Sequence, residues 1–151
     1  MADTSGTITA TCRCGQVKIT VQGPPAVTNA CHCTGCQAMT SSAFSLGVMY
    51  HGDAVTIEGE TVMGGLKGDA SQHHCCANCL SWVFTRAEGF APFINIHSAM
   101  LGDLARQPPF IEVWTDEKLD WVETGAAHSF AQFPPPGDMP GLLQEFARSR
   151  G

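Results

Sequence analysis

Eight cysteines in three tight clusters constrain this 151-residue chain more than any other feature. The clusters are Cys12 with Cys14, Cys31 with Cys33 and Cys36, and Cys75 with Cys76 and Cys79. Cysteines this close rarely bridge each other, because a disulfide needs Cα atoms about 5.5 Å apart with particular Cβ directions. The N-terminus has neither the basic start nor the apolar run of a signal peptide, which favours the cytosol, where thiols stay reduced. We therefore expect metal ligands or catalytic thiols.

Length and charge restrict the classes of protein that the chain can represent. A chain of 151 residues is one ordinary domain with a single core. It carries only eight Lys and Arg residues and a formal net charge of −6, which argues against a nucleic-acid partner because such binders need a basic face. No apolar run approaches the roughly 20 residues that span a bilayer, so we expect no membrane partner either.

Short runs of alternating apolar and polar residues between turn signals predict a mostly β fold. The predicted strands cover 7–21, as a hairpin that turns at Cys12–Gly15, and then 27–31, 43–50, 54–58, 72–75, 81–85, 93–97 and 110–114. A short helical turn is expected at 37–42. Strands of this length at this spacing are typical of a single domain of short antiparallel strands.

The two ends of the chain are expected to differ from this β body. Residues 1–6 read as a polar tail, residues 7–133 as the β domain, and residues 134–151 as a spacer followed by a short helix. The run Pro134–Pro136 favours a stiff, extended spacer. Asp138 is suited to cap the helix, and Leu142, Leu143 and Phe146 share one of its faces.

Cys12 and Cys14 are predicted to form one site with Cys76 and Cys79. Residues i and i+2 of a strand point to the same face, and a Cys-x-x-Cys turn aims two sulfurs at a common point. Four thiolates close a tetrahedral shell around zinc with Zn–S distances of about 2.3 Å, which leaves no room for water or substrate. The set indicates a structural zinc whose binding is coupled to folding. Buried free cysteines are the alternative.

Cys31, Cys33 and Cys36 offer three sulfurs within a six-residue segment. Three protein ligands leave the fourth tetrahedral position open, as catalytic zinc sites do for water or substrate. A zinc of this kind favours the thiolate form of an incoming thiol or polarises an oxygen. Spacing alone equally allows a second structural site that another residue completes. The candidates for that residue are Cys75, His32, His73 and His74.

These motifs, in this order and at this separation, resemble those of the glutathione-dependent formaldehyde-activating enzyme family, which also contains centromere protein V. The resemblance is carried by Cys12-Arg13-Cys14-Gly15, Cys31-His32-Cys33-x-x-Cys36 and Cys76-x-x-Cys79, and it runs from about Gly6 to Trp121. It implies a zinc-binding β-tent fold, with a structural zinc on the four outer cysteines Cys12, Cys14, Cys76 and Cys79.

The same resemblance implies a catalytic zinc on Cys31, Cys33 and Cys36. The implied activity adds glutathione to formaldehyde and gives S-(hydroxymethyl)glutathione. Because this reaction makes or breaks a carbon–sulfur bond, the implied class is a carbon–sulfur lyase. Its partner would be a small-molecule thiol such as glutathione.

Three residues depart from the family's pattern. Cys75 stands where the family usually has an aromatic residue before the last Cys-x-x-Cys motif, and Leu80 stands where a glycine usually follows it. Leucine makes this turn less permissive than glycine would. Glu112 occupies a position where the family tends to place a histidine. If that histidine serves the active site, this chain performs a different reaction.

Two further functions are compatible with the same residues. A non-catalytic interaction module would hold two structural zincs and bind a protein partner. A redox sensor or zinc store would use Cys75 together with the exchangeable cluster. His32, which lies between two proposed ligands, is expected to point away from them if its segment is extended.

A few polar residues are candidates for a pocket near the three-cysteine loop. His97 is the best of the isolated histidines, because Asn95 and His97 would share one face of a strand. Thr34, Gly35 and Gln37 flank the loop and are positioned to shape the entrance to an open metal position.

Overall fold

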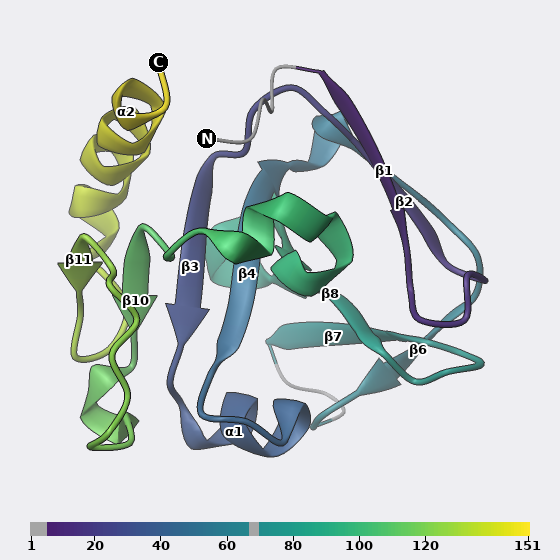
Figure 1. Ribbon diagram of the computed structural model, residues 1–151, viewed down its shortest axis with the longest axis horizontal. Helices are drawn as coiled ribbons and strands as arrows, with labels where there is room; N and C mark the ends of the chain where they lie inside the picture. Colours follow the sequence, from purple (N-terminus) through teal and green to yellow (C-terminus); the bar gives the residue numbers. More distant parts are fainter. Residues whose placement is uncertain (1–5, 67–69) are drawn as a thin grey trace.

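The computed structural model describes residues 6–66 and 70–151. Within these ranges the strands form a small sheet in the order β1-β2-β5 and a large sheet in the order β11-β10-β3-β4-β9-β8-β7-β6 (Figure 1). The strands are β1 (Thr7–Thr11), β2 (Lys18–Gln22), β3 (Val27–Cys31), β4 (Ser45–His51), β5 (Val55–Glu58), β6 (Thr61–Gly64), β7 (Ser71–Cys76), β8 (Trp82–Ala87), β9 (Phe93–His97), β10 (Ile111–Val113) and β11 (His128–Ser129).

Helices are short and few in the described ranges. The α-helices are α1 (Thr34–Thr40) and α2 (Met139–Ser149), and the 3-10 helices are η1 (Gly52–Ala54), η2 (Glu88–Phe90), η3 (Ser98–Arg106), η4 (Thr115–Glu117) and η5 (Pro136–Asp138). Neither described α-helix has the length and apolar character needed to cross a bilayer. The prediction of a mostly β fold with a C-terminal helix is confirmed.

Every predicted strand is present, with ends that move by at most two residues. β6 and β11 have no counterpart among the predicted strands. The expectation of antiparallel strands is wrong at β10, which pairs in parallel with both β3 and β11. Parallel partners need a long connection. Residues 114–127, which include η4, join β10 to β11, and the chain from α1 to η3 separates β3 from β10.

The first core lies between the two sheets. Alternation along β2 buries Ile19 and Val21, and Tyr50 of β4 and Ile94 and Ile96 of β9 belong to the same cluster. All five side chains are fully or almost fully buried. Because successive side chains of a strand point to opposite faces, the remaining positions of β4 and β9 face the other side of the large sheet.

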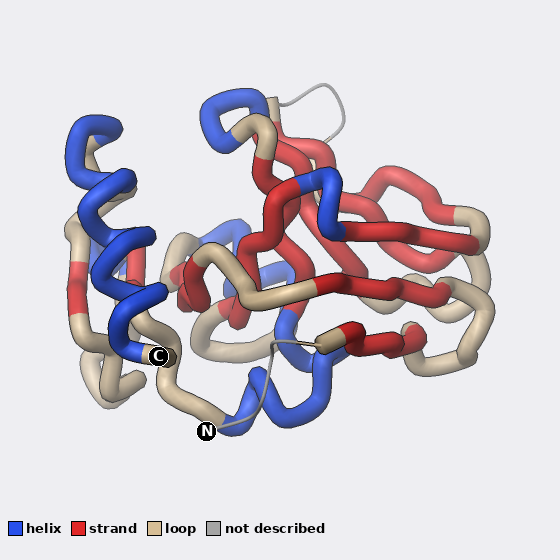
Figure 2. The backbone as a smooth tube through the Cα atoms, turned by 90° about the horizontal axis from the view of Figure 1, so that it is seen from above, coloured by secondary structure: helices blue, strands red, loops and turns tan. Residues whose placement is uncertain are grey.

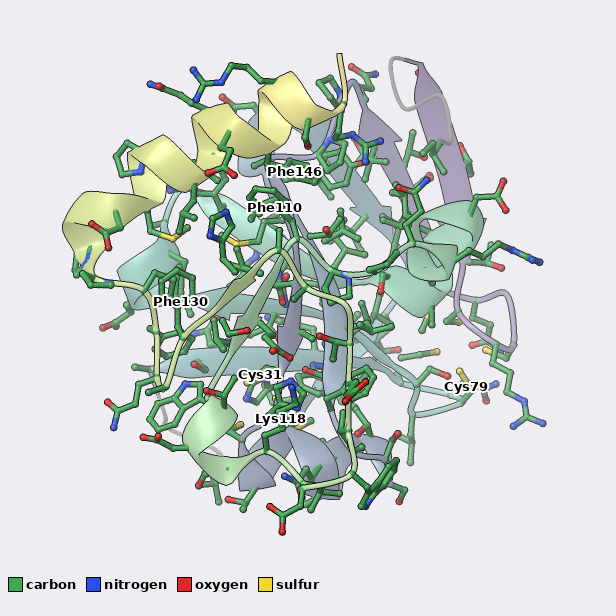
Figure 3. The ribbon with its side chains drawn as sticks, turned by 60° about the vertical axis from the view of Figure 1, so that its left-hand side comes forward. Cys31, Cys79, Phe110, Lys118, Phe130 and Phe146 are labelled. Atoms are coloured by element: carbon green, nitrogen blue, oxygen red, sulfur yellow. The ribbon has the colours of Figure 1, made fainter. Side chains whose placement is uncertain are left out.

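The second core joins α2 to the β3 and β10 end of the large sheet. Leu142 and Phe146 are buried against a cluster that includes Val27 and Ile111, and the Phe146 ring lies 5.2 Å from that of Phe110 (Figure 3). Figures 1 and 2 show the helix lying at this edge of the molecule. The helix is therefore packed on the sheet. The boundary at residue 134 remains a prediction.

Two details at the helix ends differ from expectation. The Asp138 side chain makes no capping hydrogen bond, so that capping prediction is wrong. Helix α1 begins at Thr34 instead of residue 37, because the Cys33 side chain caps its N-terminus by accepting a hydrogen bond from the Cys36 amide. It ends at Thr40, and the C-cap residue Ser41 has a left-handed φ of 49°.

Candidate metal centres and the adjoining cavity

The four outer cysteines converge on one point from two hairpin turns. Cys12 and Cys14 lie in the turn between β1 and β2, where the predicted hairpin turn places them, while Cys76 ends β7 and Cys79 lies in the turn to β8. All four Sγ atoms lie within 4.8 Å of one another. The Sγ of Cys14 is 3.6 Å from that of Cys12 and 3.7 Å from that of Cys76. Tetrahedral zinc with Zn–S bonds of about 2.3 Å separates its sulfurs by about 3.8 Å, so this set fits zinc.

Local backbone geometry shapes both turns. Gly15 has a φ of 84° and its amide donates to the Cys12 carbonyl, a conformation that glycine adopts without strain. In the second turn the Leu80 amide donates to the Cys76 carbonyl, and Leu80 has a φ of 59°. The leucine noted as a departure therefore occupies a left-handed position. Its side chain is 66% exposed.

A serine beside this set favours the ionised form of one ligand. The Sγ of Cys79 lies 3.2 Å from the Oγ of Ser81. Hydrogen bonds from the side chain and backbone of Ser81 lower the pKa of Cys79 to about 5. Since thiolates are the form that binds metal, this contact favours the form of Cys79 that a metal would need.

The central cysteines gather where β3 meets α1. Cys31 ends β3, Cys33 is the N-cap of α1, and Cys36 lies in its first turn. Their Sγ atoms lie within 4.8 Å of one another, and we call them the cysteine trio. A hydrogen bond from the Cys31 thiol lowers the pKa of Cys36 to about 6, and the same shared proton raises the pKa of Cys31. Figure 3 shows Cys31 and Cys79 well apart, so the two sets are separate sites.

None of the predicted fourth ligands joins the trio. In the described ranges no further His, Cys, Asp or Glu lies within 4.8 Å of all three sulfurs. The Nε2 of His32 lies 2.8 Å from Glu112. The ring of His73 hydrogen-bonds to Thr85 of β8, and the ring of His74 stacks on that of Phe84, also in β8. Cys75 is buried in β7, outside both groups. A metal at the trio would therefore have three protein ligands among the described residues.

Glu112 is the centre of a buried polar network behind the trio. Its carboxylate accepts hydrogen bonds from Ser129 at 2.6 Å, Thr124 at 2.8 Å and Lys118 at 3.1 and 3.2 Å, and it pairs with His32. Burial opposes its charge, but these hydrogen bonds outweigh burial and lower its pKa to about 2. His32 is fully buried and points away from its neighbouring cysteines. The network therefore anchors the segment that carries two members of the trio.

A cavity of about 950 Å³ lies on the face of the large sheet that points away from the small sheet. All three trio cysteines line it. Thr34 and Gly35 line it as expected, whereas Gln37 lies outside the lining and donates to the backbone carbonyls of His32 and Glu117. The large apolar side chains of the wall include Met39, Met49, Trp82, Phe90, Phe93, Ile111, Val113, Trp114, Phe133 and Met139.

An amide pair interrupts this apolar wall near the trio. The Nδ2 of Asn29 donates to the Oδ1 of Asn95 at 2.8 Å, and both residues line the cavity. The pair crosses over Gly47 of β4, where a Cβ would collide with both amides and come 2.7 Å from the Oδ1 of Asn29. Asn29 lies two residues before Cys31 on β3 and shares its face. We did not single out Asn29 from the sequence, although this spacing was a usable signal.

His97 also lines the cavity, as its shared face with Asn95 predicts. Its ring lies 3.8 Å from that of Trp82. Burial lowers the pKa of His97 to about 4, because a charged imidazole would lose its hydration there. At neutral pH His97 is therefore an uncharged part of the cavity wall.

Comparison with known proteins agrees with the resemblance in the cysteine motifs. The chain is 29% identical over 139 residues to a Halomonas elongata protein provisionally named a glutathione-dependent formaldehyde-activating enzyme, across 82% of this chain and 86% of that protein. A crystal structure of a Rhodobacter sphaeroides protein shares the fold with a TM-score of 0.53 and 16% identity, over 64% of this chain and 89% of that one. The family model for the glutathione-dependent formaldehyde-activating enzyme matches residues 7–117, so the chain belongs to that family.

Proposed function

We propose that the chain is a zinc-dependent carbon–sulfur lyase that joins a thiol such as glutathione to a small carbonyl compound such as formaldehyde, or separates them. Cys31, Cys33 and Cys36 would hold the catalytic zinc. Cys12, Cys14, Cys76 and Cys79 would hold the structural zinc. The observation that carries the proposal is that the trio borders a large cavity and has no fourth protein ligand in the described ranges.

The reaction balances without an oxidant or reductant. The thiol loses its proton, a bond forms between its sulfur and the carbonyl carbon, and the π bond of the carbonyl breaks. A proton then reaches the carbonyl oxygen, which becomes a hydroxyl group. Zinc held by the trio would supply a Lewis acid that favours the thiolate form of the incoming thiol.

The chain's own residues would orient the substrate and the cysteines that hold the metal. The Nδ2 of Asn95 makes no hydrogen bond to the described residues, while its Oδ1 is held by Asn29. This NH₂ group is a hydrogen-bond donor in the cavity wall. We propose that it donates a hydrogen bond to the oxygen of the adduct as that oxygen becomes a hydroxyl group. Glu112 acts at a distance, because through His32 it positions the segment that carries Cys31 and Cys33.

The alternative of a non-catalytic module needs two closed metal sites. A closed shell at the trio would require a fourth protein ligand, and the described ranges place none there. A purely structural site also does not need a cavity beside it. These features favour the enzyme over the module.

Two cysteine variants test the division of labour between the sites. Cys33→Ser should bind one zinc per chain instead of two, lose activity with glutathione and formaldehyde, and keep its β circular dichroism. Cys79→Ser should lose the folded spectrum, because the structural zinc ties two hairpins together. Zinc content, spectrum and thiol–formaldehyde turnover are measured on freshly purified protein.

The result is decisive in either direction. A Cys33→Ser protein that unfolds as badly as Cys79→Ser would show that the trio is structural. A wild-type protein with one tightly held zinc that ignores added glutathione would contradict a thiol-handling site.

A further inference from the structure

The cavity beside the trio is far larger than formaldehyde. Its volume of about 950 Å³ lies near the upper end of the roughly 300–1,000 Å³ range of pockets that enclose drug-sized ligands. Formaldehyde carries a single carbon atom and would leave almost all of this space unfilled. The part of the substrate that fills the space must come from a larger organic group.

The charges on the peptide part of glutathione argue against this part as the group that fills the cavity. Its carboxylates call for Arg or Lys partners, which hold carboxylates by charge-assisted hydrogen bonds. Among the described residues that line the cavity there is no Arg or Lys, and the one acidic side chain, Glu117, has the wrong sign. The described part of the lining thus offers no Arg or Lys partner for the charged ends of glutathione.

Part of the cavity wall is built from aromatic rings. Phe133 packs edge-on against both Phe90 at 5.1 Å and Trp114 at 5.6 Å, and all three line the cavity. Trp114 has a φ of 57°, a left-handed conformation that is unfavourable for a bulky side chain. Strained residues of this kind cluster where a ligand is held. This corner suits a flat apolar group.

We propose that the carbonyl-derived half of the substrate is an apolar group of aromatic size, which lies in the cavity against Trp114 and Phe133. The proposal rests on the thiol-adduct function proposed above and names its substrate class. An aromatic or arylalkyl aldehyde accepts the thiol sulfur on its carbonyl carbon near the trio. The thiol proton ends on the former carbonyl oxygen, within reach of the Asn95 amide. The charged ends of the thiol stay toward solvent.

Two stable thioethers test this substrate class by direct binding. S-methylglutathione and S-benzylglutathione carry the same charged peptide and differ only in the group on sulfur. Isothermal titration calorimetry on the zinc-loaded protein should give at least about tenfold tighter binding of the benzyl compound, because the cavity buries an additional ring. Ala87 lines the cavity away from the trio, so Ala87→Leu should abolish most of this preference by filling the space.

The control is Ala147→Leu, which adds the same side chain at an exposed position of α2 and should keep the preference. Equal affinity of the wild-type protein for both thioethers would overturn the substrate class and leave the thiol-adduct function intact. A benzyl preference that survives Ala87→Leu would place the ring outside this cavity and overturn the proposal. Failure of both thioethers to bind would overturn the proposed function itself.

Discussion

At the scale of single residues, Glu112 shows how one departure from a family pattern is accommodated. A carboxylate with four hydrogen-bonding partners can be buried, whereas an unpaired one cannot. Glu112 therefore holds a buried hydrogen-bond network together, and nothing in its contacts indicates that it replaces a catalytic group. Its partners come from three segments between residues 32 and 129, which is why the sequence alone gave no sign of this role.

Replacing Glu112 by Gln should destabilise the protein by about 3 kcal/mol, because it leaves buried partners of a charged group unsatisfied. Glu145→Gln is the matched control, since Glu145 also pairs with a histidine, His128, at 3.0 Å but is half exposed. That change should cost less than about 1 kcal/mol. Urea unfolding at neutral pH measures both. Equal losses would contradict the anchoring role.

The Glu112 contribution also has a defined pH dependence. Its pKa is lowered from the ordinary value of 4.5 to about 2, so the unfolded chain takes up this proton first as the pH falls. The stabilisation is complete above about pH 4.5 and is lost between there and about pH 2. The difference in free energy of unfolding between wild type and Glu112→Gln should therefore shrink across that window. The comparison is made at those pH values of the window at which both proteins keep their folded circular dichroism spectrum.

Leu80 offers a stabilising substitution. A left-handed conformation costs an L-residue about 1–2 kcal/mol, and glycine avoids that cost but loses about 0.5–1 kcal/mol of chain entropy. Leu80→Gly should therefore raise the free energy of unfolding by up to about 1 kcal/mol. Leu80→Ala keeps the Cβ and should give no such gain. Urea unfolding of the zinc-loaded proteins distinguishes the two, and equal effects would show that φ at this turn is unimportant.

At the scale of elements, local patterns predicted the strands well and their partners poorly. Alternation with a period of two located nine strands, including β9, whose alternate residues also predicted the pocket position of His97. The parallel pairing of β10 depends on a partner some 80 residues away in sequence, and no local pattern encodes it. The cavity escaped prediction for the same reason, because its wall is assembled from many strands and loops. The N-cap role of Cys33 was missed because cysteine is not among the usual capping residues.

Helix α2 tests whether the C-terminal segment belongs to the same cooperative unit. Phe146→Ala should cost about 3–5 kcal/mol, because the ring is buried in the second core. Gln144→Ala, an exposed change on the same helix, should have almost no effect. Thermal unfolding followed by circular dichroism should show one transition that moves only for Phe146→Ala. An unchanged main transition would mean that residues 134–151 fold separately, as the predicted boundary suggests.

At the scale of the whole molecule, the two cysteine sets are expected to have different roles. The four-cysteine set would stabilise the fold, and the trio would be accessible from the cavity. The four-cysteine set brings the β1–β2 hairpin of the small sheet to the β7–β8 hairpin of the large sheet, so a metal bound there would hold two halves of the fold together. The trio lies on one short segment and borders the cavity, so under the proposed function the fold would not depend on a metal there in the same way. The chain is thus expected to tolerate loss of one metal and not of the other.

This division predicts that a chelator removes zinc in two phases. The first zinc should leave quickly from the open trio while the β circular dichroism is kept. The second should leave slowly and together with the loss of that spectrum, because metal binding at the four-cysteine set is coupled to folding. A colorimetric zinc indicator and circular dichroism are followed in the same sample. Cys36→Ser should show the slow phase alone. Release of both metals in one phase, with simultaneous unfolding, would contradict the division, because both sites would then be equally closed and equally structural.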